Sequence, residues 1–204
     1  MHSKIQILNY GCSSNTADGE TLAGCLKQAG YPLTTISSEA DLIIFNSCAV
    51  KGPTENRIID DINHAPKSKK IVVTGSLPKL SYERLQREVH FDAAVRPAAG
   101  KDIVEVVGRV LAGEKIIELA EVKEIPSLTL PKMRTNPVVS VVPINFGCLG
   151  SCAYCCVVHA RGKLRSYGIH EITKRIQKDY ESGVREFWLT SQDTASYGRE
   201  IHTN

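Results

Sequence analysis

The sequence predicts an α/β fold, in which an amino-terminal parallel sheet with covering helices precedes the start of a partial (βα) barrel. Strand-like and helix-like segments alternate through the first 112 residues. The apolar runs at 41–47 and 70–75 are continuous, which is typical of strands buried on both faces of a parallel sheet. A further strand, loop, helix and strand follow residue 138. Alternation of this kind favours a parallel sheet covered on both faces.

The first domain is expected to span 1–112. The segment 16–30 has apolar residues at helical spacing and closes with Gly30. Pro53 suits the first position of a helix. Strands are predicted at 4–10, 41–47 and 70–75, and helices at 16–30, 53–63, 78–89 and 101–113.

A connector is expected at 113–137, since it contains three prolines and lacks a clear period. The second domain, 138–204, begins with a strand at 138–145, which leads into a cysteine-rich loop. A helix at 168–183 and a strand at 185–191 follow. Together they form one βαβ unit.

Composition narrows the class of protein. The 204 residues include 42% hydrophobic residues, enough for an ordinary core, and the net charge of +3 permits a polyanionic partner without identifying one. No apolar window approaches 18 residues, and the first residues lack the pattern of a signal peptide, so no membrane association is expected. We expect a cytoplasmic protein, in which clustered cysteines indicate metal binding or catalysis.

The loop after the strand 138–145 carries Cys148, Cys152 and Cys155 in the spacing C-x3-C-x2-C. Three thiolates in a short loop can bind three irons of a cubane cluster and leave the fourth iron open. A zinc knuckle, with Cys156 or His159 as fourth ligand, and an adventitious cysteine cluster are the alternatives. Cys156 is expected to point away from the loop's ligands, as a packed or solvent-facing thiol.

This spacing, with Tyr154 before the last cysteine, resembles the radical S-adenosylmethionine (SAM) superfamily. The resemblance implies a 4Fe-4S cluster that binds SAM and cleaves it reductively to methionine and a 5′-deoxyadenosyl radical. It also implies that the residues near SAM include Tyr154, Arg161, Ser191, Gln192 and Asp193. Turn or helix-capping roles for Ser191 and Asp193, and an RNA-phosphate or solvated role for Arg161, remain open.

Cys12 and Cys48 follow the first two predicted strands, and Ser76 follows the third. The carboxyl ends of neighbouring parallel strands meet in one crevice, so these loops are expected to converge. Cys25 instead falls within a helical apolar pattern and is predicted to be a core residue.

Five stretches together resemble the tRNA methylthiotransferases: "YGCSSNTADGE", "NSCAVKGPTENRI", "VVTGSLPK", "GCLGSCAYCCVVHARGKLRSY" and "FWLTSQDTASYGREI". The resemblance implies a second, auxiliary 4Fe-4S cluster held by cysteines at 12, 48 and 76. It is strongest for the archaeal and eukaryotic branch, which methylthiolates N6-threonylcarbamoyladenosine beside the tRNA anticodon. The implied partners are tRNA and an electron donor such as flavodoxin or ferredoxin.

Two features depart from that family. Ser76 stands where the family has cysteine, either natively or as a replacement, and a hydroxyl is a poorer cluster ligand than a thiolate. The auxiliary cluster is therefore expected to be weakly held or absent. The family also has a longer barrel and an RNA-binding domain, so the chain resembles a truncated form. The alternatives are a methylthiotransferase for another tRNA adenosine or a ribosomal-protein aspartate, and an inactive RNA- or partner-binding fragment.

Overall fold

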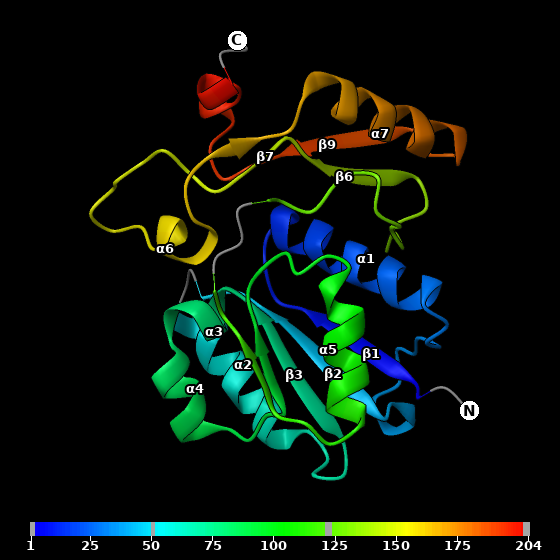
Figure 1. Ribbon diagram of the computed structural model, residues 1–204, viewed down its shortest axis with the longest axis vertical. Coiled ribbons are helices and arrows are strands. Elements are labelled where there is room, and N and C mark those ends of the chain that lie inside the picture. The colour runs from blue at the N-terminus through cyan, green and yellow to red at the C-terminus, as the bar shows by residue number, and fades with distance from the viewer. Residues whose placement is uncertain (1–2, 50–51, 121–123, 202–204) are drawn as a thin grey trace.

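The computed structural model describes residues 3–49, 52–120 and 124–201. Figure 1 shows a sheet-and-helix unit formed by the first half of the chain and a smaller unit formed by the second half. Helix α1 (Ser13–Gln28) lies between them, and it packs on strand β6 (Val139–Pro143) of the smaller unit.

The first unit contains a five-stranded parallel sheet whose strand order follows the chain. Its strands are β1 (Ile5–Asn9), β2 (Leu42–Ser47), β3 (Lys70–Gly75), β4 (Ala93–Val95) and β5 (Ile116–Glu118). Every residue of β2 is buried, as its continuous apolar run predicts. The predicted α/β class is confirmed.

Helices cover both faces of this sheet. One face packs against α1 and α5 (Asp102–Leu111), through side chains such as Leu26 and Ile103. The other face packs against α2 (Gly52–His64), α3 (Ser76–Leu80) and α4 (Tyr82–Glu88), through side chains such as Ile58 and Leu85. The layers match the arrangement that the alternating segments predict.

The structure differs from the sequence prediction in two places here. The helix predicted at 78–89 is two helices, because the backbone leaves the helical region at Ser81 (φ −132°, ψ 41°). Strand β5 lies inside the predicted connector 113–137 and adds to the first sheet, beside β4. Residues 121–123 of that connector lie outside the described residues. Three-residue strands such as β4 and β5 are too short to show a period.

The second unit contains the predicted βαβ element. Strands β6 and β9 (Glu186–Thr190) are parallel, and α7 (Ile169–Glu181) lies between them in the chain. The short strands β7 (Asn145–Phe146) and β8 (Arg165–Ser166) pair antiparallel, and the helix α6 (Val157–Arg161) directly follows the last cysteine of the loop between them. The described residues also contain the 3-10 turns η1 (Ser37–Glu39), η2 (Thr194–Ser196) and η3 (Arg199–Ile201). In the described ranges, no helix combines the length and apolarity needed to cross a membrane.

Candidate iron–sulfur and cofactor site

A cavity of about 530 Å³ lies where the carboxyl ends of the first three strands face the cysteine-rich segment of the second unit. Cofactor and small-molecule sites typically enclose about 300–1,000 Å³. Both groups of cysteines that the sequence singled out contribute to its wall. The predicted site residues that line it are Cys12, Cys48, Ser76, Cys148, Cys155, Arg161, Ser191 and Gln192.

The first three strands deliver the amino-terminal wall. Cys12 is the residue before α1, Cys48 follows β2, and Ser76 is the first residue of α3, directly after β3. Because β1, β2 and β3 are neighbours in the sheet, their end loops lie side by side, as predicted. The amino end of α1 also carries the positive end of a helix dipole, which favours a negatively charged ligand.

Gly75 makes the tight turn that presents Ser76. Its φ is +93°, and a Cβ there would stand 2.1 Å from the carbonyl oxygen of Ser47. The Ser47 hydroxyl donates to the carbonyl of Thr74 and accepts from the N–H of Leu77 at 3.2 Å. These bonds hold the end of β3 against the end of β2, so position 76 stays close to Cys48.

A buried amide network holds the loops of β1 and β2 together. Asn15 is only 3% exposed, and its Nδ2 donates to Asn46 Oδ1 at 2.9 Å and to the carbonyl of Ser47 at 3.2 Å. Asn46 Nδ2 in turn donates to Asn9 Oδ1 at 2.7 Å. The Oδ1 of Asn15, which also lines the cavity, has no hydrogen-bond partner among the described residues. It is a buried acceptor available to a ligand.

The cysteine-rich segment forms the facing wall. Cys148 and Cys155 line the cavity, whereas Cys152 is exposed and does not. Gly150 lies close to two of these thiols, because a Cβ on it would be 3.4 Å from Cys148 Sγ and 3.6 Å from Cys152 Sγ. The N–H of Gly150 donates to Cys148 Sγ at 3.2 Å. A Cβ at position 150 would therefore be in ordinary van der Waals contact with both thiols.

The residues predicted near SAM separate into two groups. Ser191 and Gln192 line the cavity, and the Ser191 hydroxyl and the Gln192 Oε1 are buried without a partner in the described part of the chain. Tyr154 is 92% exposed, and the Asp193 carboxylate accepts from the N–H of Ala195 at 3.1 Å. The turn-capping alternative therefore describes Asp193, while the first two oxygens remain available to a ligand.

Arg161 is held by an internal ion pair that the sequence did not reveal. Its Nη2 donates to Asp18 Oδ2 at 2.6 Å, and its guanidinium lies 5.1 Å from the centre of the Phe146 ring. Burial raises the pKa of the Asp18 carboxyl above its ordinary value, and the guanidinium acts against this shift. Arg161 is thus not the solvated charge that was one alternative from the sequence, since only 7% of its side chain is exposed.

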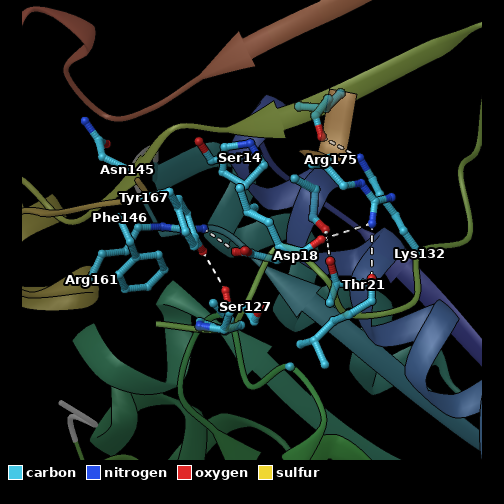
Figure 2. Close-up of a pocket in the computed structure, with 18 residues that line it drawn as sticks. Ser14, Asp18, Thr21, Ser127, Lys132, Asn145, Phe146, Arg161, Tyr167 and Arg175 are labelled. Carbon is cyan, nitrogen blue, oxygen red and sulfur yellow. Dashed lines mark hydrogen bonds and ion pairs between the residues drawn. The ribbon is translucent and has the colours of Figure 1, made fainter. Parts of the chain in front are cut away.

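The ion pair belongs to the polar junction between the two units. Figure 2 shows Asp18 and Arg161 pointing toward each other across a small cavity, with Lys132 at its other end. That cavity encloses about 40 Å³, which suits a few waters and not a cofactor. Lys132 forms a buried pair with Glu20 at 3.0 Å, and burial lowers the pKa of its ammonium. Two carboxylates of α1 therefore form ion pairs with two cationic side chains, Arg161 and Lys132, from the second half of the chain.

The donor set fits iron–sulfur clusters better than a single ion. All seven cysteines are free. Within the described ranges, no three His, Cys, Asp or Glu side chains are grouped closely enough to hold one metal ion. A cubane binds each thiolate on a different iron, so its ligands stand farther apart than those of one ion. Five cysteines line the cavity, and thiolates are the ligands that such clusters take.

One thiol in the wall was not expected there. Cys156 lines the cavity and is half-buried, with its Sγ 3.8 Å from the carbonyl oxygen of Ala49. The sequence predicted a packed or solvent-facing thiol, and a half-buried thiol in contact with Ala49 is packed. Its position in the cavity wall was not predicted, because spacing alone does not reveal the short helix α6 that begins at the next residue. Cys25 is buried in the core of the first unit, as predicted.

The chain matches known proteins along nearly its whole length. Residues 4–96 match the Uncharacterized protein family UPF0004. The chain is 40% identical to the human threonylcarbamoyladenosine tRNA methylthiotransferase over 208 residues, which cover 98% of this chain and 36% of that protein. It is 39% identical to the Danio rerio protein of the same name, over 97% of this chain and 37% of that protein.

An archaeal relative shows similar agreement. The probable threonylcarbamoyladenosine tRNA methylthiotransferase of Pyrococcus abyssi is 37% identical over 204 residues, covering 98% of this chain and 48% of that protein. The chain thus spans between about a third and a half of the length of these relatives. Residues 4–96 are therefore similar to the family UPF0004, and nearly the whole chain is similar to the threonylcarbamoyladenosine tRNA methylthiotransferases of eukaryotes and archaea.

Proposed function

We propose that this chain carries the cluster-binding centre of a methylthiotransferase that acts on N6-threonylcarbamoyladenosine beside the tRNA anticodon. The relatives named for that activity support the substrate. The observation that carries the proposal is the shared cavity, because cysteines more than 130 positions apart line its walls. A reaction that uses two clusters on one substrate needs both within one site.

The cysteines divide into two sets of cluster ligands. Cys148, Cys152 and Cys155 would hold the SAM cluster, and Cys12 and Cys48 would contribute to the auxiliary cluster. When bound, the SAM cluster supplies the electron that cleaves the sulfonium of SAM. Around it, the chain supplies a partly buried wall and polar atoms without a partner in the described residues.

Ser191 and Gln192 are the residues best placed to bind SAM. Each has a buried oxygen without a partner in the described residues, and leaving such an atom unpaired costs about 1–3 kcal/mol. The amino and hydroxyl groups of SAM are donors that would satisfy these oxygens. The proposal therefore explains why two consecutive residues of the cavity wall each have a buried oxygen without a partner in the described residues.

The partners follow from the reaction. A tRNA is the substrate, and a one-electron donor such as a flavodoxin or ferredoxin is required to reduce the clusters. Cluster chemistry of this kind is compatible with a reducing compartment such as the cytoplasm. The absence of disulfide bonds among the seven cysteines is consistent with that compartment.

The first experiment is anaerobic reconstitution with iron and sulfide, followed by reduction in the presence of SAM. We expect formation of 5′-deoxyadenosine, and its loss in Cys152→Ala, with Cys25→Ala as the matched control for removal of a thiol outside the cavity. Methylthiolation is then assayed by mass spectrometry on tRNA that carries N6-threonylcarbamoyladenosine. The proposal would be overturned if the reconstituted chain binds no iron. It would also be overturned if the Cys152→Ala variant cleaves SAM as well as the unsubstituted chain does.

A further inference from the structure

We propose that Cys156 is the third thiolate ligand of the auxiliary cluster in this chain, where Ser76 supplies only a hydroxyl. The inference rests on the proposed function, since it assumes a cluster at Cys12 and Cys48. Its starting point is that the amino-terminal wall offers two thiols and a hydroxyl, while a further thiol reaches the same cavity from the other unit.

The fold brings position 156 to the amino-terminal wall. Helices α3 and α6 pack against each other. Ser76 is the first residue of α3, and Cys156 is the residue directly before α6. The Cys156 Sγ lies 3.8 Å from the carbonyl oxygen of Ala49, the residue after Cys48. The thiol therefore approaches the wall at the place where positions 48 and 76 meet.

Adjacent cysteines can serve different clusters at this point in the chain. Cys156 has a near-helical backbone (φ −92°, ψ −2°). Successive side chains on a helical backbone point about 100° apart, since one turn takes about 3.6 residues. Cys155 can therefore remain with the SAM cluster loop while Cys156 faces the amino-terminal cysteines.

The other thiols do not offer a substitute. Cys25 is 4% exposed in the core between α1 and the sheet and does not line the cavity. Cys148, Cys152 and Cys155 form the three-thiolate loop. Cys156 is thus the one cavity-lining cysteine that neither group uses. Its thiolate is also a far better ligand for iron–sulfur clusters than the hydroxyl of Ser76.

The test isolates the auxiliary site in a Cys148→Ala/Cys152→Ala/Cys155→Ala background of the full chain. After anaerobic reconstitution, iron and sulfide analysis should give about four irons per chain, as one cubane requires. Adding Cys156→Ala should remove nearly all of this iron. Adding Ser76→Cys to that variant should restore about four irons. Cys25→Ala in the same background is the matched control and should retain the cluster.

A second readout leaves Cys156 in place and so does not depend on the stability of a Cys156→Ala variant. In the triple background, the tryptic peptide 135–161 contains Cys156 as its only cysteine. Alkylation of that thiol should be at least tenfold slower in the iron-loaded protein than in the iron-free protein. Far-UV circular dichroism of each variant identifies any loss that is due to unfolding.

The outcomes separate this inference from the proposed function. Retention of about four irons after Cys156→Ala would overturn the inference and leave the proposed function intact. An iron-free triple background, beside an unsubstituted chain that binds about four irons, would also overturn it while the SAM cluster stands. An unsubstituted chain without iron would overturn both.

Discussion

The buried pair Asp18–Arg161 should make a large contribution to the docking of the two units. The two side chains are 12% and 7% exposed, and their charged atoms are 2.6 Å apart. At an effective dielectric constant of about 20, two unit charges at that distance attract by about 6 kcal/mol before desolvation. Removal of one partner leaves the other charge buried and unpaired, which typically costs about 3–5 kcal/mol. We therefore expect Asp18→Asn to lower the free energy of unfolding by about 3 kcal/mol or more.

The matched control is Glu39→Gln. Glu39 pairs with Lys4 at 3.0 Å, a comparable distance, but these side chains are 45% and 49% exposed. Solvent screening limits exposed pairs to less than about 1 kcal/mol. Burial, rather than the presence of an ion pair, is therefore the variable that the comparison isolates.

Urea unfolding followed by two probes measures the effect. Trp188 is the single tryptophan and lies on β9, so its fluorescence reports the second unit, while far-UV circular dichroism reports the whole chain. Arg161→Met and the double variant complete the cycle, and the coupling energy should be about 1–3 kcal/mol. If Asp18→Asn is no more destabilising than Glu39→Gln, the junction is not held by this pair and the reasoning fails.

Three further predictions concern the cavity and its supporting loops. Ser191→Ala and Gln192→Ala should each weaken SAM binding to the iron-loaded chain about three- to tenfold in equilibrium dialysis. The free energy of unfolding should change by less than about 0.5 kcal/mol, and a large loss of stability would show that these atoms have structural partners. Gly75→Ala should destabilise the chain by about 1–3 kcal/mol from its positive φ alone, with the clash against Ser47 adding to this, and a urea midpoint equal to that of the unsubstituted chain would contradict the turn described. Asn15→Asp removes the buried donors to its three acceptors and should cost about 3 kcal/mol in the same assay; an unchanged midpoint would mean that the amide network does not hold the loops.

The amino-terminal half shows how much local pattern can determine. Continuous apolar runs identify β2 and β3 because strands buried on both faces leave no polar positions. Once β1, β2 and β3 are parallel neighbours, Cys12, Cys48 and Ser76 must follow their carboxyl ends, so their convergence was predictable. The C-x3-C-x2-C loop was equally clear, since all its ligands lie within eight consecutive residues.

Tertiary structure alone decided the features that join the two halves. The sequence separation between Asp18 and Arg161 is 143 residues, and no local period encodes their contact. The placement of Cys156 likewise depends on α6 packing against α3, which begins 80 positions earlier. The hydrophobic pattern of a sequence indicates which face of a helix or strand is buried. It does not record which distant charged or thiol group will meet that element once the units dock, because that depends on the combined packing of both.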